Sequence, residues 1–191
     1  SCDISLVKTS KGTFLVVEDT GTVGLMGDNI PSLDIQRRVD AGEPLGVEER
    51  LARFTSMNNS GGNQTGGGLY GVGKVVYTVA SNDYHYYFDS LRADGKYVAN
   101  DNKCGQVHEL AYEGNEATEF ILNSTGLQKK TTTGTRIIIV NPKNEIVEAI
   151  SNGDLIKFIQ ESWWIIMGRM GADSFISVNN VRVSIPDKIK N

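Results

Sequence analysis

"VVEDTGTVGLMG", residues 16–27, joins an apolar segment to a loop punctuated by glycine. The apolar run belongs to "TFLVVED" (13–19), whose β-branched residues predict a strand that ends at Asp19. Gly21 and Gly24 follow, and glycine lets a flat ligand come close to the backbone because it has no Cβ. Asp19 is therefore a candidate for recognising such a ligand. The alternative is an aspartate that only caps the turn after the strand.

The segments on either side of this stretch indicate the fold class. "DISLVKT" (3–9) alternates apolar and polar residues, which predicts a strand that forms a hairpin with 13–19. Further strand-like segments are "YHYYFDSLR" (84–92), "KYVAND" (96–101), "QVHELAY" (106–112), "TEFILN" (118–123), "TTTGTRIIIV" (131–140) and a closing hairpin at 174–186 around Asn179 and Asn180. Helices are expected at 32–39, 46–54, 144–150 and 153–167, whereas 71–81 fits a helix or a strand. The order predicts an α+β fold, a two-layer sandwich of a mixed, mostly antiparallel sheet with helices on one face.

Composition limits the classes of protein that fit. The chain has 191 residues and a formal net charge of −4, which favours one domain and gives no support for broad binding to nucleic acid. No apolar run approaches the roughly 20 residues of a membrane span. Two cysteines, Cys2 and Cys104, are too few for a disulfide framework, so we expect a protein of the reducing cytoplasm.

A second glycine-rich stretch, "GGGLYGVGKVV" (66–76), nearly matches a phosphate-binding P-loop. Gly68, Gly73 and Lys74 satisfy the spacing, but Val75 stands where the hydroxyl that ligates Mg²⁺ is required. The polar segment before it does not fit the buried strand that a P-loop follows. A P-loop is therefore not expected, and a glycine-rich turn without a ligand is one alternative.

Three motifs in order change this interpretation: D-x-G-x-x-G after a strand, G-x-x-G-x-G-K after a long polar segment, and Gly-Thr at the start of a later strand. This order resembles the ATP-binding domain of the GHKL superfamily (the Bergerat fold), shared by DNA gyrase, ninety-kilodalton heat-shock chaperones, sensor histidine kinases and MutL. It is nearest to the chaperone- and MORC-like bacterial branch. The matching residues are Asp19, Gly21 and Gly24, then Gly68, Gly71, Gly73 and Lys74, then Gly134 and Thr135.

The resemblance implies a site and a division of the chain. Asp19 would bind the amino group of adenine, with Gly21 and Gly24 beside the base and Thr135 helping through a water molecule. The phosphates, with Mg²⁺, would lie at a helix N-terminus formed by Gly68, Tyr70, Gly71, Val72, Gly73 and Lys74. An ATP-binding domain is expected over 1–150, with a lid at 28–68. A helix and hairpin at 151–191 would contact a following module.

One motif of the family is absent. No helix precedes Asp3, although the family carries the Mg²⁺-binding Asn and the Glu that activates water on such a helix. Either that helix lies upstream of this chain, which is the option we expect, or the protein lacks it, and no general base is assigned. The main hypothesis is an ATPase whose lid and homodimer are controlled by ATP. The alternatives are a nucleotide-binding module without hydrolysis, as in a kinase ATP lobe or a pseudo-ATPase, and an α+β interaction domain without a ligand.

Other polar and aromatic residues carry weaker signals. His85 and His108 have no metal ligand at a suitable spacing, so structural or exposed roles are expected. One of the adjacent Trp163 and Trp164 is expected in the core, and the other at an interface with a second copy or a following domain. Gln128, Lys129 and Lys130 are expected in a solvated turn.

Overall fold

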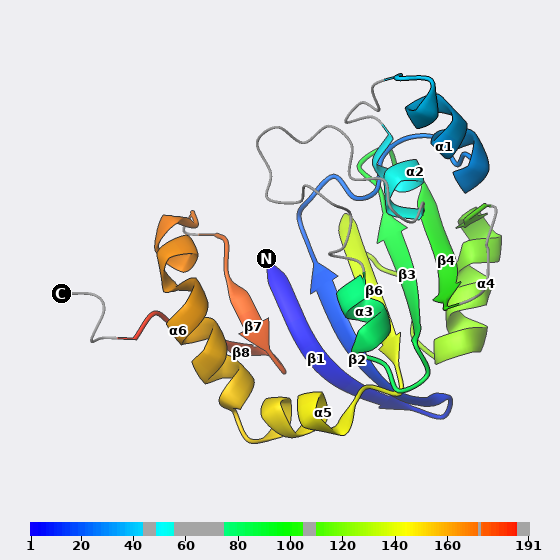
Figure 1. The fold of residues 1–191 in the computed structure, drawn as a ribbon. Helices are drawn as coiled ribbons and strands as arrows, with labels where there is room; N and C mark the ends of the chain where they lie inside the picture. Colours follow the sequence, from blue (N-terminus) through cyan, green and yellow to red (C-terminus); the bar gives the residue numbers. More distant parts are fainter. Residues whose placement is uncertain (44–48, 56–74, 105–109, 172, 187–191) are drawn as a thin grey trace.

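The computed structural model describes residues 1–43, 49–55, 75–104, 110–171 and 173–186. Within these residues the strands form one sheet in the order β5-β4-β3-β6-β2-β1-β7-β8 (Figure 1). The strands are β1 (Cys2–Thr9), β2 (Gly12–Asp19), β3 (His85–Leu91), β4 (Tyr97–Lys103), β5 (Tyr112–Glu113), β6 (Gly134–Val140), β7 (Ile176–Val178) and β8 (Val181–Arg182). Neighbours pair antiparallel except β1 and β7, which are parallel.

Two predicted hairpins are confirmed. In the first, β1 and β2 pair in register from Cys2 opposite Asp19 to Thr9 opposite Gly12. In the second, Asn179 and Asn180 join β7 to β8 with φ of 48° and 64°. Asparagine tolerates this left-handed conformation better than most residues, which suits the two-residue turn. Because β7 pairs with β1, the C-terminal segment 151–191 contributes to the same sheet as 1–150.

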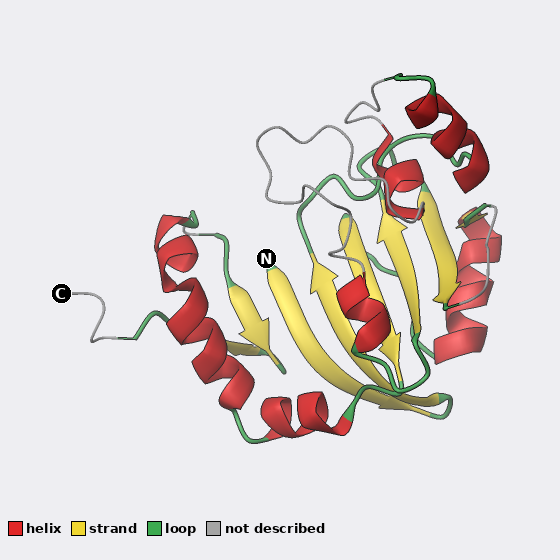
Figure 2. Cartoon of the chain, viewed as in Figure 1, coloured by secondary structure: helices red, strands yellow, loops and turns green. Residues whose placement is uncertain are grey.

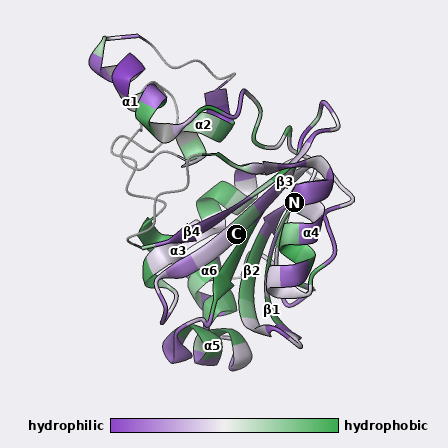
Figure 3. Ribbon diagram, turned by 90° about the vertical axis from the view of Figure 1, so that its right-hand side faces the viewer, coloured by the Kyte–Doolittle hydropathy of each residue, from purple (hydrophilic) through white to green (hydrophobic). Residues whose placement is uncertain are grey.

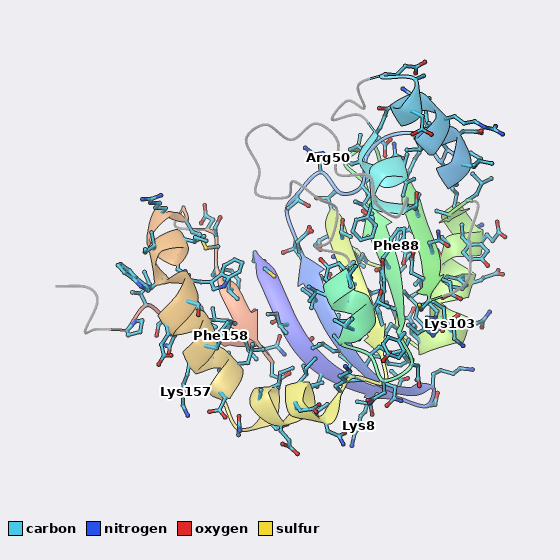
Figure 4. All side chains as sticks on the ribbon, in the orientation of Figure 1. Lys8, Arg50, Phe88, Lys103, Lys157 and Phe158 are labelled. Atoms are coloured by element: carbon cyan, nitrogen blue, oxygen red, sulfur yellow. The ribbon has the colours of Figure 1, made fainter. Side chains whose placement is uncertain are left out.

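Most helices cover one face of the sheet (Figure 2). They are α2 (Arg50–Thr55), α3 (Val75–Val79), α5 (Asn144–Ser151) and α6 (Asp154–Arg169). Leu15, Phe88 and Ile137 of the sheet pack against this layer, which we call the helical face. Figure 4 labels Phe88, whose ring meets that of Phe54 in α2 at 4.9 Å between centroids. Helix α1 (Ser32–Asp40) packs on α2 through Ile35 and Ala52.

The opposite face is covered by α4 (Gly114–Thr125). Ala117 and Ile121 of this helix pack on Phe14, Val16 and Ile138. The predicted strand at "TEFILN" is therefore wrong, because these residues lie inside α4. Figure 3 shows hydrophobic residues along the central strands, between the two helical layers. The predicted α+β class with a mixed, mostly antiparallel sheet is confirmed, and α4 is an addition on the second face.

None of the helices in the described part of the chain is long and apolar enough to cross a membrane.

Two buried tyrosines lead to a prediction on alkaline stability. Burial raises the pKa of Tyr86 and of Tyr97, and the carboxylate of Asp89 raises that of Tyr97 further. An unfolded tyrosine ionises near pH 10, so the folded state retains these protons after the unfolded state has lost them. We expect the free energy of unfolding to fall as the pH rises above about 10, as measured by urea titration. Tyr86→Phe should reduce that fall, and an identical fall in this variant would contradict the prediction.

Candidate functional site

Three polar side chains lie in a row across adjacent strands. The pairing of Glu18 with Arg136 places Asp19, at the end of β2, beside Thr135 of β6. Thr135 in turn pairs with Ser90 of β3. All three lie on the helical face, because side chains alternate along a strand and Leu15, Phe88 and Ile137 point to that face. We call Asp19, Thr135 and Ser90 the polar row.

Asp19 is held by two hydrogen bonds to the same carboxylate oxygen. Oδ1 accepts from the Thr22 hydroxyl at 2.6 Å and from the backbone N–H of Thr135 at 3.0 Å. The residue is half-buried. Within the described part of the chain Oδ2 has no hydrogen-bond partner, so it is available to accept from a ligand. The turn contact from Thr22 and the cross-strand contact coexist, so Asp19 both caps the turn and presents a fixed carboxylate.

Two glycines allow the backbone to pack closely around the row. At Gly134, with φ of 138°, a Cβ would lie 2.3 Å from the backbone oxygen of Asp19 and 2.4 Å from its Oδ1. At Gly24, with φ of 72°, a Cβ would lie 2.8 Å from both the Ser90 Oγ and the Leu91 backbone oxygen. A side chain at either position would therefore collide with the site as well as strain the backbone.

Ser90 connects the loop after β2 to the sheet. Its buried hydroxyl accepts from the N–H of Leu25 at 2.9 Å and donates to the Gly134 carbonyl at 3.0 Å. It also lies 3.3 Å from the Thr135 hydroxyl. Ser90 belongs to none of the sequence motifs. The only sequence signal is a small hydroxyl residue in an otherwise bulky strand, and its partner becomes evident only from the register of β3 and β6.

A buried cation supports Asp19 from the opposite face of the sheet. The side chain of Lys130 is fully buried, forms an ion pair with Glu18, and donates from Nζ to the Asp19 backbone oxygen at 3.0 Å. The expectation that Lys130 lies in a solvated turn is therefore wrong, whereas Gln128 and Lys129 are exposed. Lysine is buried almost only when paired, and Glu18 supplies the charge that makes burial tolerable here.

A second buried ion pair lies beside the first. Arg136 donates from Nε to Asp89 Oδ1 at 2.9 Å and from Nη2 to Oδ2 at 2.5 Å. The Tyr97 hydroxyl also donates to Asp89, and Arg136 reaches the Gln128 carbonyl at 2.8 Å. Burial raises the pKa of Asp89, while the guanidinium and the phenol oppose this shift. Lys130 and Arg136 thus fix the segment before β6 beneath the polar row.

The second glycine motif directly precedes the helix α3 in the sequence. Gly68, Tyr70, Gly71, Val72, Gly73 and Lys74 lie outside the described residues. The helix α3 begins directly after them at Val75, which decides the helix-or-strand alternative for the described part of 71–81 in favour of a helix. Its Tyr77 contacts Tyr86 of β3, with ring centroids 5.5 Å apart, so α3 packs on the helical face.

The expected lid at 28–68 is described only in part. Its described helices, α1 and α2, follow the glycine loop, and the N–H of Leu51 donates to the Met26 carbonyl at 2.9 Å. Arg92 Nη1 reaches the Gly27 carbonyl at 2.6 Å. These contacts tie the loop after Asp19 to α2 and to the end of β3.

The described residues include candidate metal-ligating and thiol side chains. No group of three or more His, Cys, Asp or Glu residues among them is arranged to hold a metal ion. His85 pairs with Asp101 at 2.5 Å, while His108 lies outside the described residues. Cys2 and Cys104 are both free thiols.

A scan against protein-family models finds no match, and a search of curated proteins finds no relative.

Proposed function

We propose that the polar row binds the adenine ring of ATP or ADP, and that the chain is a cytoplasmic nucleotide-binding domain of the GHKL type. The observation that carries this proposal is the hydrogen bond between Asp19 and Thr135. These residues stand 116 positions apart in two separate motifs, and a hydrogen bond brings them into contact. A glycine-rich turn without a ligand would not require the two motifs to meet.

The chemistry of the row favours adenine over guanine. An ionised carboxylate only accepts hydrogen bonds, so the free Oδ2 of Asp19 suits the exocyclic amino group of adenine. Guanine presents a carbonyl oxygen at the equivalent position, which the carboxylate would repel, so guanine would have to turn and bind through its N1–H and 2-amino group. The hydroxyl of Thr135 is half-buried and can donate or accept, directly or through a water molecule, at the neighbouring ring nitrogen.

ATP hydrolysis forms a separate step of the proposal. In the main hypothesis ATP orders the lid, favours a dimer, and is then hydrolysed. Mg²⁺ would accompany the nucleotide, and no cluster of His, Cys, Asp or Glu ligands for it occurs among the described residues. Glu18 is engaged by Lys130 on the opposite face, so it does not serve as a general base. The alternative is a module that binds nucleotide without hydrolysing it, and phosphate release distinguishes the two.

Calorimetric titration tests the adenine site. We expect ADP and a non-hydrolysable ATP analogue with Mg²⁺ to bind, and Asp19→Asn to weaken ADP binding by about 10- to 100-fold, the worth of a hydrogen bond to a charged group. GDP should bind more weakly than ADP. The matched control is Asp173→Asn, an identical change at an exposed residue outside the row, which should leave affinity unchanged.

Two results would contradict the proposal. One is equal affinity of Asp19→Asn and the unaltered chain for ADP, because the row would then not contact the base. The other is the absence of binding by either, which would favour the α+β interaction domain without a ligand.

A further inference from the structure

Helix α6 exposes several apolar residues that a monomer would normally bury. Phe158, Trp163, Trp164, Ile165 and Ile166 are between 38% and 59% exposed. On the inner side, Ile156, Ile159 and Met167 pack against the core. Single exposed apolar residues are ordinary, but several along one helix mark a candidate interaction surface. Helical spacing places Phe158 and Ile165 on the outer side, whereas Trp163, four positions from both Ile159 and Met167, lies on the inner side. Figure 1 places α6 at the outer edge of the helical layer, away from α3.

One face of α6 has the spacing of a helix-pairing seam. Its positions step along the helix by three or four residues, and all are exposed: Phe158, then Glu161 and Ser162, then Ile165, then Gly168 and Arg169. This spacing aligns side chains along one side of a helix, as in the contact of two paired helices. We call these six residues the outer stripe. Trp164 and Ile166 flank it and widen its apolar area.

We infer that the outer stripe binds the same stripe of a second copy of this chain, with the two α6 helices antiparallel and Ile165 at the two-fold axis. In that arrangement Glu161 of each copy lies at the level of Arg169 of the other. Ser162 likewise faces the level of Gly168, beside which Ile185 Cδ1 of the same chain lies 3.7 Å from where a Cβ would stand. A parallel arrangement would instead bring Glu161 to Glu161 and Arg169 to Arg169.

The charges of the outer stripe indicate that its binding partner is a second copy of this chain. A two-fold interface must be complementary to itself, and the opposite charges at equal distances from Ile165 meet this condition twice. The other charges of the helix do not disturb the seam, because Lys157 already pairs with Asp154 at 3.0 Å (Figure 4 labels Lys157 beside Phe158). Charged residues that flank a helical seam set partner and orientation.

The size of the outer stripe determines how strongly we expect the two copies to associate. A helix of 16 residues is about 24 Å long, so a contact of two such helices falls below the roughly 800 Å² per partner of a standard interface. The dimer is therefore weak and depends on protein concentration. This inference does not rest on nucleotide binding, and it is tested without nucleotide.

Sedimentation velocity tests the interface first. We expect the dimer fraction to rise as the chain is concentrated over about a hundredfold range, and Ile165→Glu to weaken association by at least about tenfold by placing like charges at the axis. Leu122→Glu is the matched control, since Leu122 is 40% exposed on α4, far from the stripe in the fold. Circular dichroism confirms that each variant is folded.

A charge exchange tests the antiparallel arrangement. Glu161→Arg and Arg169→Glu should each weaken association, and the double variant should restore it. A chain that stays monomeric at every concentration would overturn the inference, and a different protein or domain would then be the occupant. Unchanged association of the Ile165→Glu variant would overturn the inference as well. So would a double variant that associates no better than the single charge exchanges.

Discussion

Arg136→Met is expected to lower the free energy of unfolding by about 3–5 kcal/mol, the range for removing one partner of a buried ion pair. Asp89 has no exposed surface, and Arg136 supplies two of its hydrogen bonds, at 2.9 and 2.5 Å. Methionine fills much of the same volume but leaves a buried carboxylate with only the Tyr97 hydroxyl. Equilibrium unfolding in urea, followed by circular dichroism, measures the loss.

The pH dependence of this variant identifies the cause. Without the guanidinium, burial raises the pKa of Asp89 further. The variant protein therefore keeps its stability at low pH, where Asp89 is protonated, and loses stability as the pH rises through the pKa of Asp89. The variant should therefore lie closer to the unaltered protein in acid than at neutral pH. Asp89→Asn combined with Arg136→Met should recover part of the loss, because no charge is then buried unpaired.

An exposed ion pair supplies the control. Arg37 pairs with Asp34 on α1 at 3.0 Å, but its side chain is 71% exposed. Solvent screens such a pair, so Arg37→Met should change stability little. Equal losses at the two arginines would show that the Asp89–Arg136 pair contributes no more than a surface contact.

Local patterns predicted the strands better than the helix on the second face. The alternation of apolar and polar residues predicted the β1–β2 hairpin, and the two adjacent asparagines predicted the β7–β8 turn. Both predictions succeeded because these structures depend on neighbouring residues alone. "TEFILN" is short and carries bulky apolar residues, so it fits a strand equally well. The buried pair Ala117 and Ile121, four apart, shows the helical period, but only packing against Phe14 and Ile138 decides it.

Some residues of the candidate site could be predicted from the sequence, and others could not. The family resemblance implied that Asp19 and Thr135 serve one adenine site, and the two residues are in contact. Ser90 and Lys130 could not be predicted as part of the site. Ser90 meets Thr135 only because of the register between β3 and β6, and Lys130 is buried only because it pairs with Glu18. Lysine in a polar segment predicts exposure unless its partner is known. The second glycine motif stays a prediction.

Gly134→Ala is expected to disturb both stability and the proposed adenine site. The new Cβ would lie 2.3 Å from the Asp19 backbone oxygen, in a chain segment held on both sides by the sheet. Strain at positive φ costs about 1–2 kcal/mol, and forced repacking adds about 1–3 kcal/mol. Because relief of the clash moves Asp19, ADP should also bind at least about tenfold more weakly in calorimetric titration.

Gly153→Ala separates the cost of backbone strain from the cost of repacking in the Gly134→Ala variant. Gly153 also has positive φ, at 83°, but a Cβ there meets nothing within 4 Å. This variant should show the backbone strain alone, about 1–2 kcal/mol in urea unfolding, with unchanged ADP affinity. If the two variants lose equal stability, the close approach of Gly134 to Asp19 contributes nothing. If Gly134→Ala loses stability but binds ADP normally, the glycine serves the fold, and the carboxylate of Asp19 is not the group that recognises the base.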